Sequence, residues 1–315
     1  MNYRSLSDLS EAIRMNLHRL PGDVDLVVGI PRSGLLAANV IALLLNLPLA
    51  SVRDLLDNRP LEVGRTRKCE RNALVFPAEA KHVLVVDDSI ASGGSMTHAR
   101  EQIEARGGAQ RVSYCAVYAS RRDHAGVDFV FESVTMPRMF EWNLMHHPLL
   151  STCCVDIDGI LCFDPAPEEN DDGERYLSFL VNARPLTLPS LPVGNLVTSR
   201  LEKYRSQTDE WLRRNDVQFG RLHMLDLPSA EERRRLGSHA TFKASIYREC
   251  VEAPLFIESE ADQAESIANL SGKPVLCYST QQMYMPGVSV RTVQAKGRSF
   301  LNRAARKLYK MLSRR

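Results

Sequence analysis

The chain has 315 residues, of which 44% are hydrophobic and 25% are charged, and its formal net charge is +2. This length and composition predict a globular protein with two domains of ordinary size. No apolar run reaches the roughly 18 residues that a membrane-spanning helix needs. The seven cysteines form no C-x-x-C pair. We therefore expect buried, reduced thiols in a cytoplasmic protein, rather than disulfides or a zinc site.

The first predicted element is a helix near the amino terminus. Ser5 and Asp8 form a capping start, and apolar residues follow at helical spacing, so a signal peptide is not expected. A buried strand at 25–28 then leads through the turn Gly29-Ile30-Pro31-Arg32-Ser33-Gly34 into an apolar helix at 35–45. A glycine-bearing turn between a strand and a helix can bind an anion through its N–H groups, and Arg32 adds positive charge.

The most informative stretch is 83–96, with the sequence VLVVDDSIASGGSM. Its apolar residues 83–86 predict a buried parallel strand. Asp87 and Asp88 follow where that strand is expected to end, at the edge where open α/β sheets bind ligands. A loop of small residues can then surround a phosphate before a helix that is expected to begin at Met96. The loop residues are Ala91, Ser92, Gly93, Gly94 and Ser95.

This stretch resembles the signature of type I phosphoribosyltransferases, which use phosphoribosyl pyrophosphate (PRPP). The resemblance implies that Asp87 and Asp88 hold the ribose 2- and 3-hydroxyls and that residues 91–95 hold the 5-phosphate. The earlier turn is similar to the family's pyrophosphate loop, with Pro31, Arg32, Ser33 and Gly34 as the matching residues. The segment 53–80 occupies the place of the family's mobile lid, although a solvated basic hairpin fits it equally well. Its cations include Arg59, Arg65, Arg67, Lys68 and Arg71.

Downstream of the phosphate loop we predict a helix at 96–106 and a strand at 112–119. Asp123 and His124 follow that strand and would face the acceptor, where either could act as a general base for a hydroxyl. A polar surface loop is an equally good interpretation of these two residues. The aromatic segment 140–143 would form either a wall on the acceptor side or a seam between domains. We place this first domain at 1–148.

A second pattern begins with a buried strand that ends in Asp156-Ile157-Asp158-Gly159. It resembles the haloacid dehalogenase-like (HAD) phosphatases, whose four sequence pieces occur here in the family's order. The resemblance implies that Asp156 is a nucleophile, that Asp158 is a general acid/base, and that Thr198 and Lys243 bind the phosphoryl group.

The fourth piece, 255–262, departs from the family's usual Gly-Asp. Glu258 or Glu260 would join Asp156 and Asp158 in holding Mg²⁺. We place this domain at 149–293, with a small cap in 164–192. The predicted fold is therefore α/β, with two tandem doubly wound parallel-sheet domains.

The carboxyl-terminal segment 294–315 is strongly basic. From Lys296 to Arg315 it holds eight Lys or Arg residues and no acids, and its apolar residues share one helical face. A basic amphipathic helix suits the anionic inner face of the cytoplasmic membrane, although a solubilising helix would show the same pattern. We expect a peripheral membrane contact rather than a nucleic-acid partner.

Together the two resemblances predict consecutive reactions. Mg²⁺-bound PRPP would give its 5-phosphoribosyl group to an acceptor with release of pyrophosphate, and the phosphatase would then remove the 5-phosphate to leave ribofuranose. Such pairs resemble systems that build bacterial surface polysaccharides, which suggests a lipid-linked glycan hydroxyl as the acceptor. The alternatives are nucleobase salvage with an attached nucleotide phosphatase, a non-catalytic PRPP sensor, and synthesis of a lipid-phosphate ribosyl donor. Whether the chain forms a homodimer stays open.

Overall fold

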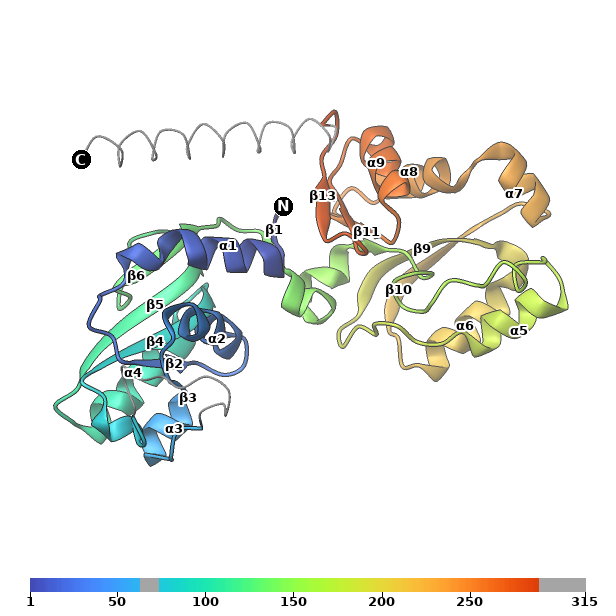
Figure 1. Cartoon of the computed structure of the whole chain (residues 1–315). Helices are drawn as coiled ribbons and strands as arrows, with labels where there is room; N and C mark the ends of the chain where they lie inside the picture. The colour runs from blue at the N-terminus through green and yellow to red at the C-terminus, as the bar shows by residue number, and fades with distance from the viewer. Residues whose placement is uncertain (63–73, 289–315) are drawn as a thin grey trace, which may run out of the picture. The chain divides into compact units, whose positions relative to one another are not determined.

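The computed structural model describes residues 1–62 and 74–288 (Figure 1). The chain divides into two compact units, residues 2–142 and the part from Asn143 onwards. Among the described residues, no helix has both the length and the apolar character needed to cross a membrane. The basic tail lies outside the described residues, as do the predicted lid cations Arg65, Arg67, Lys68 and Arg71.

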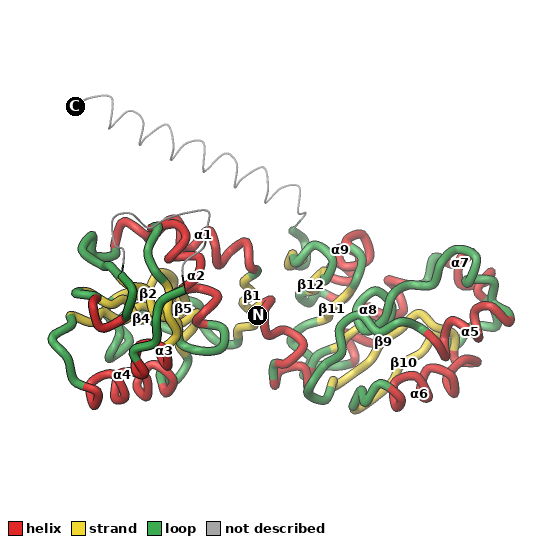
Figure 2. The backbone as a smooth tube through the Cα atoms, turned by 60° about the horizontal axis from the view of Figure 1, so that its bottom comes forward, coloured by secondary structure: helices red, strands yellow, loops and turns green. Residues whose placement is uncertain are grey.

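The first unit is built on a five-stranded, fully parallel sheet with the order β3-β2-β4-β5-β6. Helices α1 and α2 pack on one face of the sheet, and α3 and α4 pack on the other (Figures 1 and 2). A separate short pair joins β1 to β7. The strands are β1 Asn2–Arg4, β2 Leu26–Gly29, β3 Leu49–Ser51, β4 His82–Ile90, β5 Arg111–Ala119, β6 Phe129–Ser133 and β7 Arg138–Phe140. The helices are α1 Leu6–Asn16, α2 Gly34–Leu45, α3 Val52–Asp57 and α4 Gly94–Arg106, with 3₁₀ turns at Leu17–Arg19 and Pro77–Glu79. A 3₁₀ turn at Glu141–His146 spans the boundary at residue 142, and another at Pro148–Thr152 belongs to the second unit.

Strand β4 forms the centre of this sheet because its apolar run is buried on both faces. Leu84 and Val86 pack against α1 and α2, while Val83 and Val85 pack against α3 and α4. The strand does not end at Val86 as predicted. It stays paired with β5 as far as Ile90, so the two acids lie within the strand.

Two further boundaries differ from the prediction. Helix α4 begins at Gly94 rather than Met96, so the last two residues of the predicted phosphate loop form the helix's first turn. The predicted irregular segment that starts at Arg53 begins instead within α3. This helix has a full capping box, in which Ser51 and Asp54 exchange hydrogen bonds between side chain and backbone. The S-x-x-D spacing was therefore a usable sequence signal.

The second unit contains a six-stranded sheet with the order β10-β9-β8-β11-β12-β13, parallel except for the antiparallel edge strand β13. Helices α8 and α9 pack together on one face (Figure 1). The strands are β8 Cys154–Val155, β9 Val193–Leu201, β10 Phe219–Leu225, β11 Phe256–Glu258, β12 Val275–Cys277 and β13 Gln282–Tyr284. The helices are α5 Glu174–Asn182, α6 Arg205–Arg214, α7 Ala230–Leu236, α8 His239–Glu249 and α9 Ala261–Ser271, with a 3₁₀ turn at Glu202–Tyr204.

Candidate functional site

The acid pair of the first unit is buried. Asp87 is 7% exposed and Asp88 is 3% exposed, and the backbone N–H of Asp88 donates to Asp87 Oδ1 at 3.0 Å. Burial, together with the negative charge of Asp88, raises the pKa of Asp87 to about 8. A like charge this close in a dry site favours the protonated form of Asp87. The two carboxyls can accept hydrogen bonds from a polyol such as a ribose ring.

The predicted pyrophosphate turn packs directly against this pair. The N–H of Ile30 donates to Val86 O at 2.9 Å, and the peptide bond between Pro31 and Arg32 is cis. A Cβ placed on Gly34 would lie 2.9 Å from both Asp87 Oδ1 and Val86 O. Gly34 is therefore required for this close approach. Arg32 is exposed beside it, where its guanidinium can meet an anionic ligand.

The predicted phosphate loop turns at Gly93, which has φ +88° and so favours glycine. The amino end of α4 follows at once, with Gly94 and Ser95 exposed in its first turn and Ala91 and Ser92 exposed before it. A Cβ on Gly93 would lie 2.7 Å from Cε1 of His124. The structure thus places His124 over the loop. Asp123 is exposed next to it.

Trp142 is a neighbour of the acid pair that its sequence position did not reveal. Its indole Nε1–H donates to Asp88 Oδ2 at 2.8 Å. The ring stacks on Phe140 with centroids 4.8 Å apart, and Phe140 in turn stacks on Tyr118 at 5.4 Å. Of the two roles considered for residues 140–143, this geometry favours a wall beside the ligand. Trp142 also fixes the orientation of one carboxylate.

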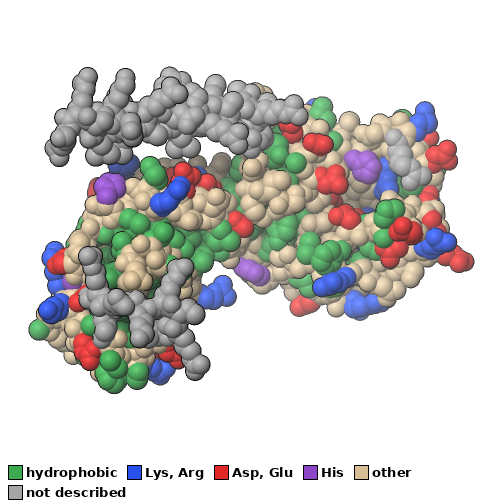
Figure 3. Space-filling view, in the orientation of Figure 1, with side chains coloured by type: hydrophobic (Ala, Val, Ile, Leu, Met, Phe, Trp, Pro, Cys, Tyr) green, Lys and Arg blue, Asp and Glu red, His purple; other side chains and the backbone are tan. Residues whose placement is uncertain are grey.

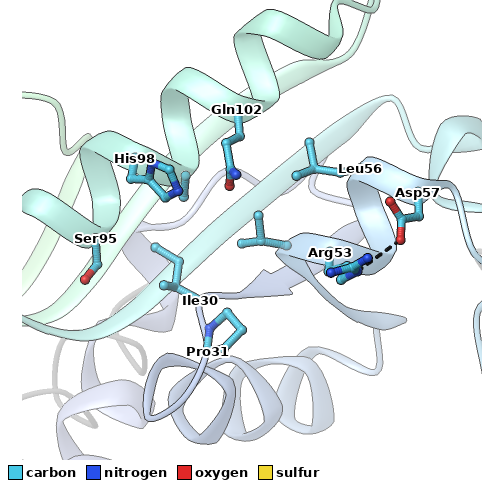
Figure 4. Close-up of a pocket in the computed structure, with 10 residues that line it drawn as sticks. Ile30, Pro31, Arg53, Leu56, Asp57, Ser95, His98 and Gln102 are labelled. Atoms are coloured by element: carbon cyan, nitrogen blue, oxygen red, sulfur yellow. Dashed lines mark hydrogen bonds and ion pairs between the residues drawn. The ribbon is translucent and has the colours of Figure 1, made fainter.

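A cavity of about 470 Å³ lies next to this site. Its walls come from α3 and α4, with Ile30 and Pro31 at the base, and the side chains of His98 and Gln102 extend from α4 (Figure 4). On the α3 side, Arg53 is held by Asp57 at 3.2 Å. Pro31 and Ser95 line both the cavity and the predicted PRPP site, but Asp87 and Asp88 are not among the lining residues.

In the second unit, Lys243 joins two buried carboxylates. Its Nζ donates to Asp156 Oδ2 at 2.6 Å and to Glu258 Oε2 at 2.8 Å, and all three side chains are almost fully buried. Asp156 directly follows β8, Glu258 ends β11, and Lys243 comes from α8. Burial raises the pKa of Asp156 to about 7 against the opposing effect of Lys243. The structure thus brings three predicted residues together.

The structure gives Asp158 a partner that the sequence reasoning missed. Arg200 donates from Nε to Asp158 Oδ2 at 3.0 Å and from Nη2 to Oδ1 at 2.6 Å. Although burial opposes it, the Arg200 charge holds the pKa of Asp158 below its usual range. An ionised, ion-paired carboxylate cannot donate a proton. The general acid/base role of Asp158 stays a prediction, and this ion pair favours the proton-accepting form.

The remaining predicted residues of this site lie in different surroundings. Thr198 is fully buried within β9, and its Oγ1 accepts from the N–H of Arg200 at 3.2 Å. Glu260 is exposed at the amino end of α9, where it accepts from Gln263. Among residues 1–62 and 74–288, no group of three or more His, Cys, Asp or Glu side chains is arranged to hold a metal ion.

Comparison with known proteins finds a similarity for the first part of the chain. Residues 3–148 match the model of the phosphoribosyl transferase domain. The solved structure of a purine phosphoribosyltransferase from Pyrococcus horikoshii Ot3 is 19% identical, with a TM-score of 0.33, and the match covers 45% of this chain and 94% of that one. The Helicobacter pylori xanthine-guanine-hypoxanthine phosphoribosyltransferase is 14% identical, with a TM-score of 0.33 and coverage of 45% and 92%.

A third solved structure, the UMP synthase of Leishmania donovani, is 19% identical with a TM-score of 0.27, covering 44% of this chain and 27% of that one. No curated protein matches the chain. The domain match ends at residue 148. Any role for the second unit therefore rests on its own geometry.

Proposed function

We propose that the first unit transfers the 5-phosphoribosyl group of PRPP to an acceptor and releases pyrophosphate. The observation that carries this proposal is the close packing of the turn at Pro31–Gly34 against the acid pair, within residues that match the phosphoribosyl transferase domain. Ser95, at the end of the loop Ala91–Ser95, lines a cavity together with Pro31 of this turn. PRPP has three groups to be bound. The carboxylates can accept hydrogen bonds from the ribose hydroxyls, Arg32 can bind the pyrophosphate, and the amino end of α4 can bind the 5-phosphate. Mg²⁺ would enter with the pyrophosphate.

In this scheme the chain's own residues bind and orient the donor. Asp87 and Asp88 accept hydrogen bonds from the 2- and 3-hydroxyls. Arg32 faces the pyrophosphate and stabilises the charge that grows on it as the C1–O bond breaks. His124, which lies over Gly93, stands where a base could take the acceptor's proton. The acceptor then bonds to C1.

We propose further that the second unit removes the 5-phosphate from the product. Its sheet order places β8 centrally, so that Asp156 and Glu258 emerge at the same edge and meet Lys243. This arrangement supports the HAD-like interpretation. Asp156 would attack phosphorus and form an aspartyl-phosphate as the P–O bond to the sugar breaks, and the sugar oxygen would take a proton from solvent. Water would then hydrolyse the aspartyl-phosphate and release phosphate, while Lys243 would neutralise the phosphate oxygens.

The donor set fits Mg²⁺ in part. Asp156 and Glu258 offer oxygen atoms at one point, which is the ligand type that Mg²⁺ prefers. Asp158 is engaged by Arg200 and Glu260 is turned toward Gln263, so Asp156 and Glu258 are the residues that would hold the ion. Bound there, the cation would offset the charge between phosphate and carboxylates. Ionised Asp158 is suited to accept a proton from a hydrolytic water, but not to protonate the leaving sugar while Arg200 holds it.

The half-buried indole of Trp142 beside Asp88 favours a second candidate, transfer to a planar nucleobase that stacks against the aromatic wall. We still favour a glycan hydroxyl as the acceptor, because removal of the 5-phosphate would then leave a plain ribofuranose on the glycan. A lipid-phosphate acceptor would use the same donor site.

Mass analysis of the products formed from PRPP tests this choice. The full chain is incubated with Mg²⁺, PRPP and either a glycan-lipid or a panel of nucleobases. We expect a glycan heavier by one pentose without phosphate, together with pyrophosphate. A nucleoside or nucleotide would establish the salvage reaction instead. Binding of labelled PRPP without pyrophosphate release for any acceptor would establish a sensor and overturn the transfer proposal.

The Trp142 contact leads to a prediction about donor affinity. Trp142→Phe keeps the stack on Phe140 but removes the hydrogen bond to Asp88. A hydrogen bond to a charged group contributes about 1.5–3 kcal/mol, so we expect PRPP affinity, measured by calorimetry, to weaken about tenfold or more.

The matched control for this variant is Trp211→Phe, because the chain has two tryptophans and Trp211 bonds to Ala183 O in the second unit. It should bind PRPP like the wild type. It also leaves Trp142 as the single fluorescent tryptophan, whose emission should change as PRPP binds. Unchanged emission, or equal affinity in both variants, would remove Trp142 from the donor site.

A further inference from the structure

Arg233, on α7 of the second unit, is a buried cation without a carboxylate partner. It is 7% exposed, and among the described residues it takes part in no ion pair. Its Nη1 donates to the backbone oxygen of Ser199 at 2.8 Å, while its Nε has no partner. An unpaired buried charge is costly. The site is therefore expected to receive a compensating anion.

The neighbouring cations differ from Arg233 in this respect. Arg200 is matched by Asp158, and Lys243 is matched by Asp156 and Glu258. On the same helix, Arg235 is exposed and pairs with Glu232. Acidic and basic side chains are interspersed on the surface of this unit that Figure 3 shows. Acidic side chains are thus available in this unit, yet none of those described pairs with Arg233.

Two hydroxyl groups, on β9 and at the start of α8, are also buried and without partners in the part of the chain that the structure describes. One is Ser199 Oγ, at the carboxyl end of β9, whose own backbone oxygen binds Arg233. The other is Ser238 Oγ, at the N-cap of α8, where it makes no capping hydrogen bond. Native proteins rarely leave such donors unsatisfied. The first turn of α8 adds free backbone N–H groups and the positive end of a helix dipole.

Arg233 and Lys243 both act electrostatically on His239. Burial, followed by the positive charges of Arg233 and Lys243, lowers the pKa of His239 to about 4. His239 directly follows Ser238 and lies one turn before Lys243 on α8. Ser199 directly precedes Arg200, which binds Asp158, and Ser238 is the N-cap of the helix that carries Lys243. Both hydroxyls therefore belong to elements that supply the predicted phosphatase site.

We infer that Arg233, with the hydroxyls of Ser199 and Ser238, forms an anion subsite of the second unit that holds the phosphate of a phosphomonoester. This inference deepens the proposed phosphatase step and rests on it for the choice of substrate. The guanidinium and two hydroxyls supply donors to the phosphate oxygens. Lys243 approaches the same group from the side of Asp156.

Hydrogen–deuterium exchange of the full chain, with inorganic phosphate as the probe, tests the subsite. Phosphate should protect peptides that contain Ser199 and residues 230–243. Arg233→Met should weaken the phosphate dependence of that protection about tenfold or more. Arg235→Met, on the exposed side of the same helix, should leave it unchanged. Protection of peptides around residues 91–97 in the first unit serves as an internal control and should be equal in all variants.

Two additional measurements distinguish an effect of the substitution on folding from an effect on phosphate binding. Because Arg233→Met removes an unpaired charge, its thermal midpoint without phosphate should equal or exceed that of the wild type, while its stabilisation by phosphate should be lost. If that variant does not fold, Ser199→Ala supplies the test, with a smaller loss of phosphate protection. Equal protection in wild type and variants, or none at these peptides at saturating phosphate, would overturn the subsite. Phosphate could also protect these peptides in an Arg233-dependent way while the protein releases phosphate from no phosphomonoester. That result would support the anion subsite and contradict the proposed phosphatase activity.

Discussion

Replacing both Asp87 and Asp88 by asparagine is expected to lower PRPP turnover by about 10²- to 10⁴-fold and to leave the second unit's activity intact. Above about pH 8, where Asp87 is ionised, each carboxylate would lose a charge-assisted hydrogen bond to a ribose hydroxyl, and each such bond contributes about 1.5–3 kcal/mol. The two amides keep the shape of the acids. Pyrophosphate release from PRPP is the measurement.

The control for this pair is Asp25→Asn. Asp25 accepts from the N–H groups of Lys81 and His82 at 2.9 Å, so it lies at the other end of β4 from the acid pair. Its loss should leave turnover close to the wild-type value. A double variant of Asp87 and Asp88 that turns over PRPP within tenfold of the wild type would show that the pair does not bind the donor.

The same substitution should change how stability depends on pH. The pKa of Asp87 is raised to about 8 by burial and by Asp88, above the ordinary value near 3.9 of an unfolded chain. The native state therefore binds more protons than the unfolded state between about pH 4 and pH 8, and stability falls as pH rises through that window. The double asparagine variant removes the ionisation. Its thermal midpoint should exceed that of the wild type at pH 8.5, and the difference should shrink at pH 5.

The sequence predicted the centre of the first unit well because burial on both faces leaves a clear pattern. The run at 83–86 is apolar at every position, which is the signature of a strand covered by helices on each side. The predicted carboxyl end of this strand was wrong for a physical reason. Aspartate has low strand propensity, yet pairing with β5 extends β4 through both acids to Ile90, and tertiary pairing overrides local preference.

The partners of the predicted acids could not be read from spacing. Trp142 lies 54 residues from Asp88, and Arg200 lies 42 residues from Asp158. No periodicity or motif connects residues so far apart in the chain. Arg200 changes the chemistry expected of Asp158, since a motif identifies a residue type but not the charges that fold against it. The four-piece motif therefore identified candidate residues, but it could not give the charges that surround them.

Asp156→Asn is the variant expected to separate the two proposed reactions. If Asp156 attacks phosphorus, the amide cannot form the covalent intermediate, and phosphate release should fall by at least about 10³-fold. Transfer from PRPP should continue, because the acid pair belongs to the other unit. Mass analysis should then show the acceptor carrying a 5-phosphoribosyl group that accumulates.

The control for Asp156→Asn is Glu210→Gln, which removes a carboxylate from the surface of α6, where it pairs with Arg214, and should leave phosphate release unchanged. The introduced amide oxygen would still accept from Lys243, and Glu258 would still neutralise that ammonium, so the fold of the site should persist. A product without phosphate from the Asp156 variant would mean that this unit does not carry out the second step. Asp158 is engaged by Arg200 and Glu258 by Lys243, so neither carboxylate is free to take the place of Asp156, and a large loss is the expected result.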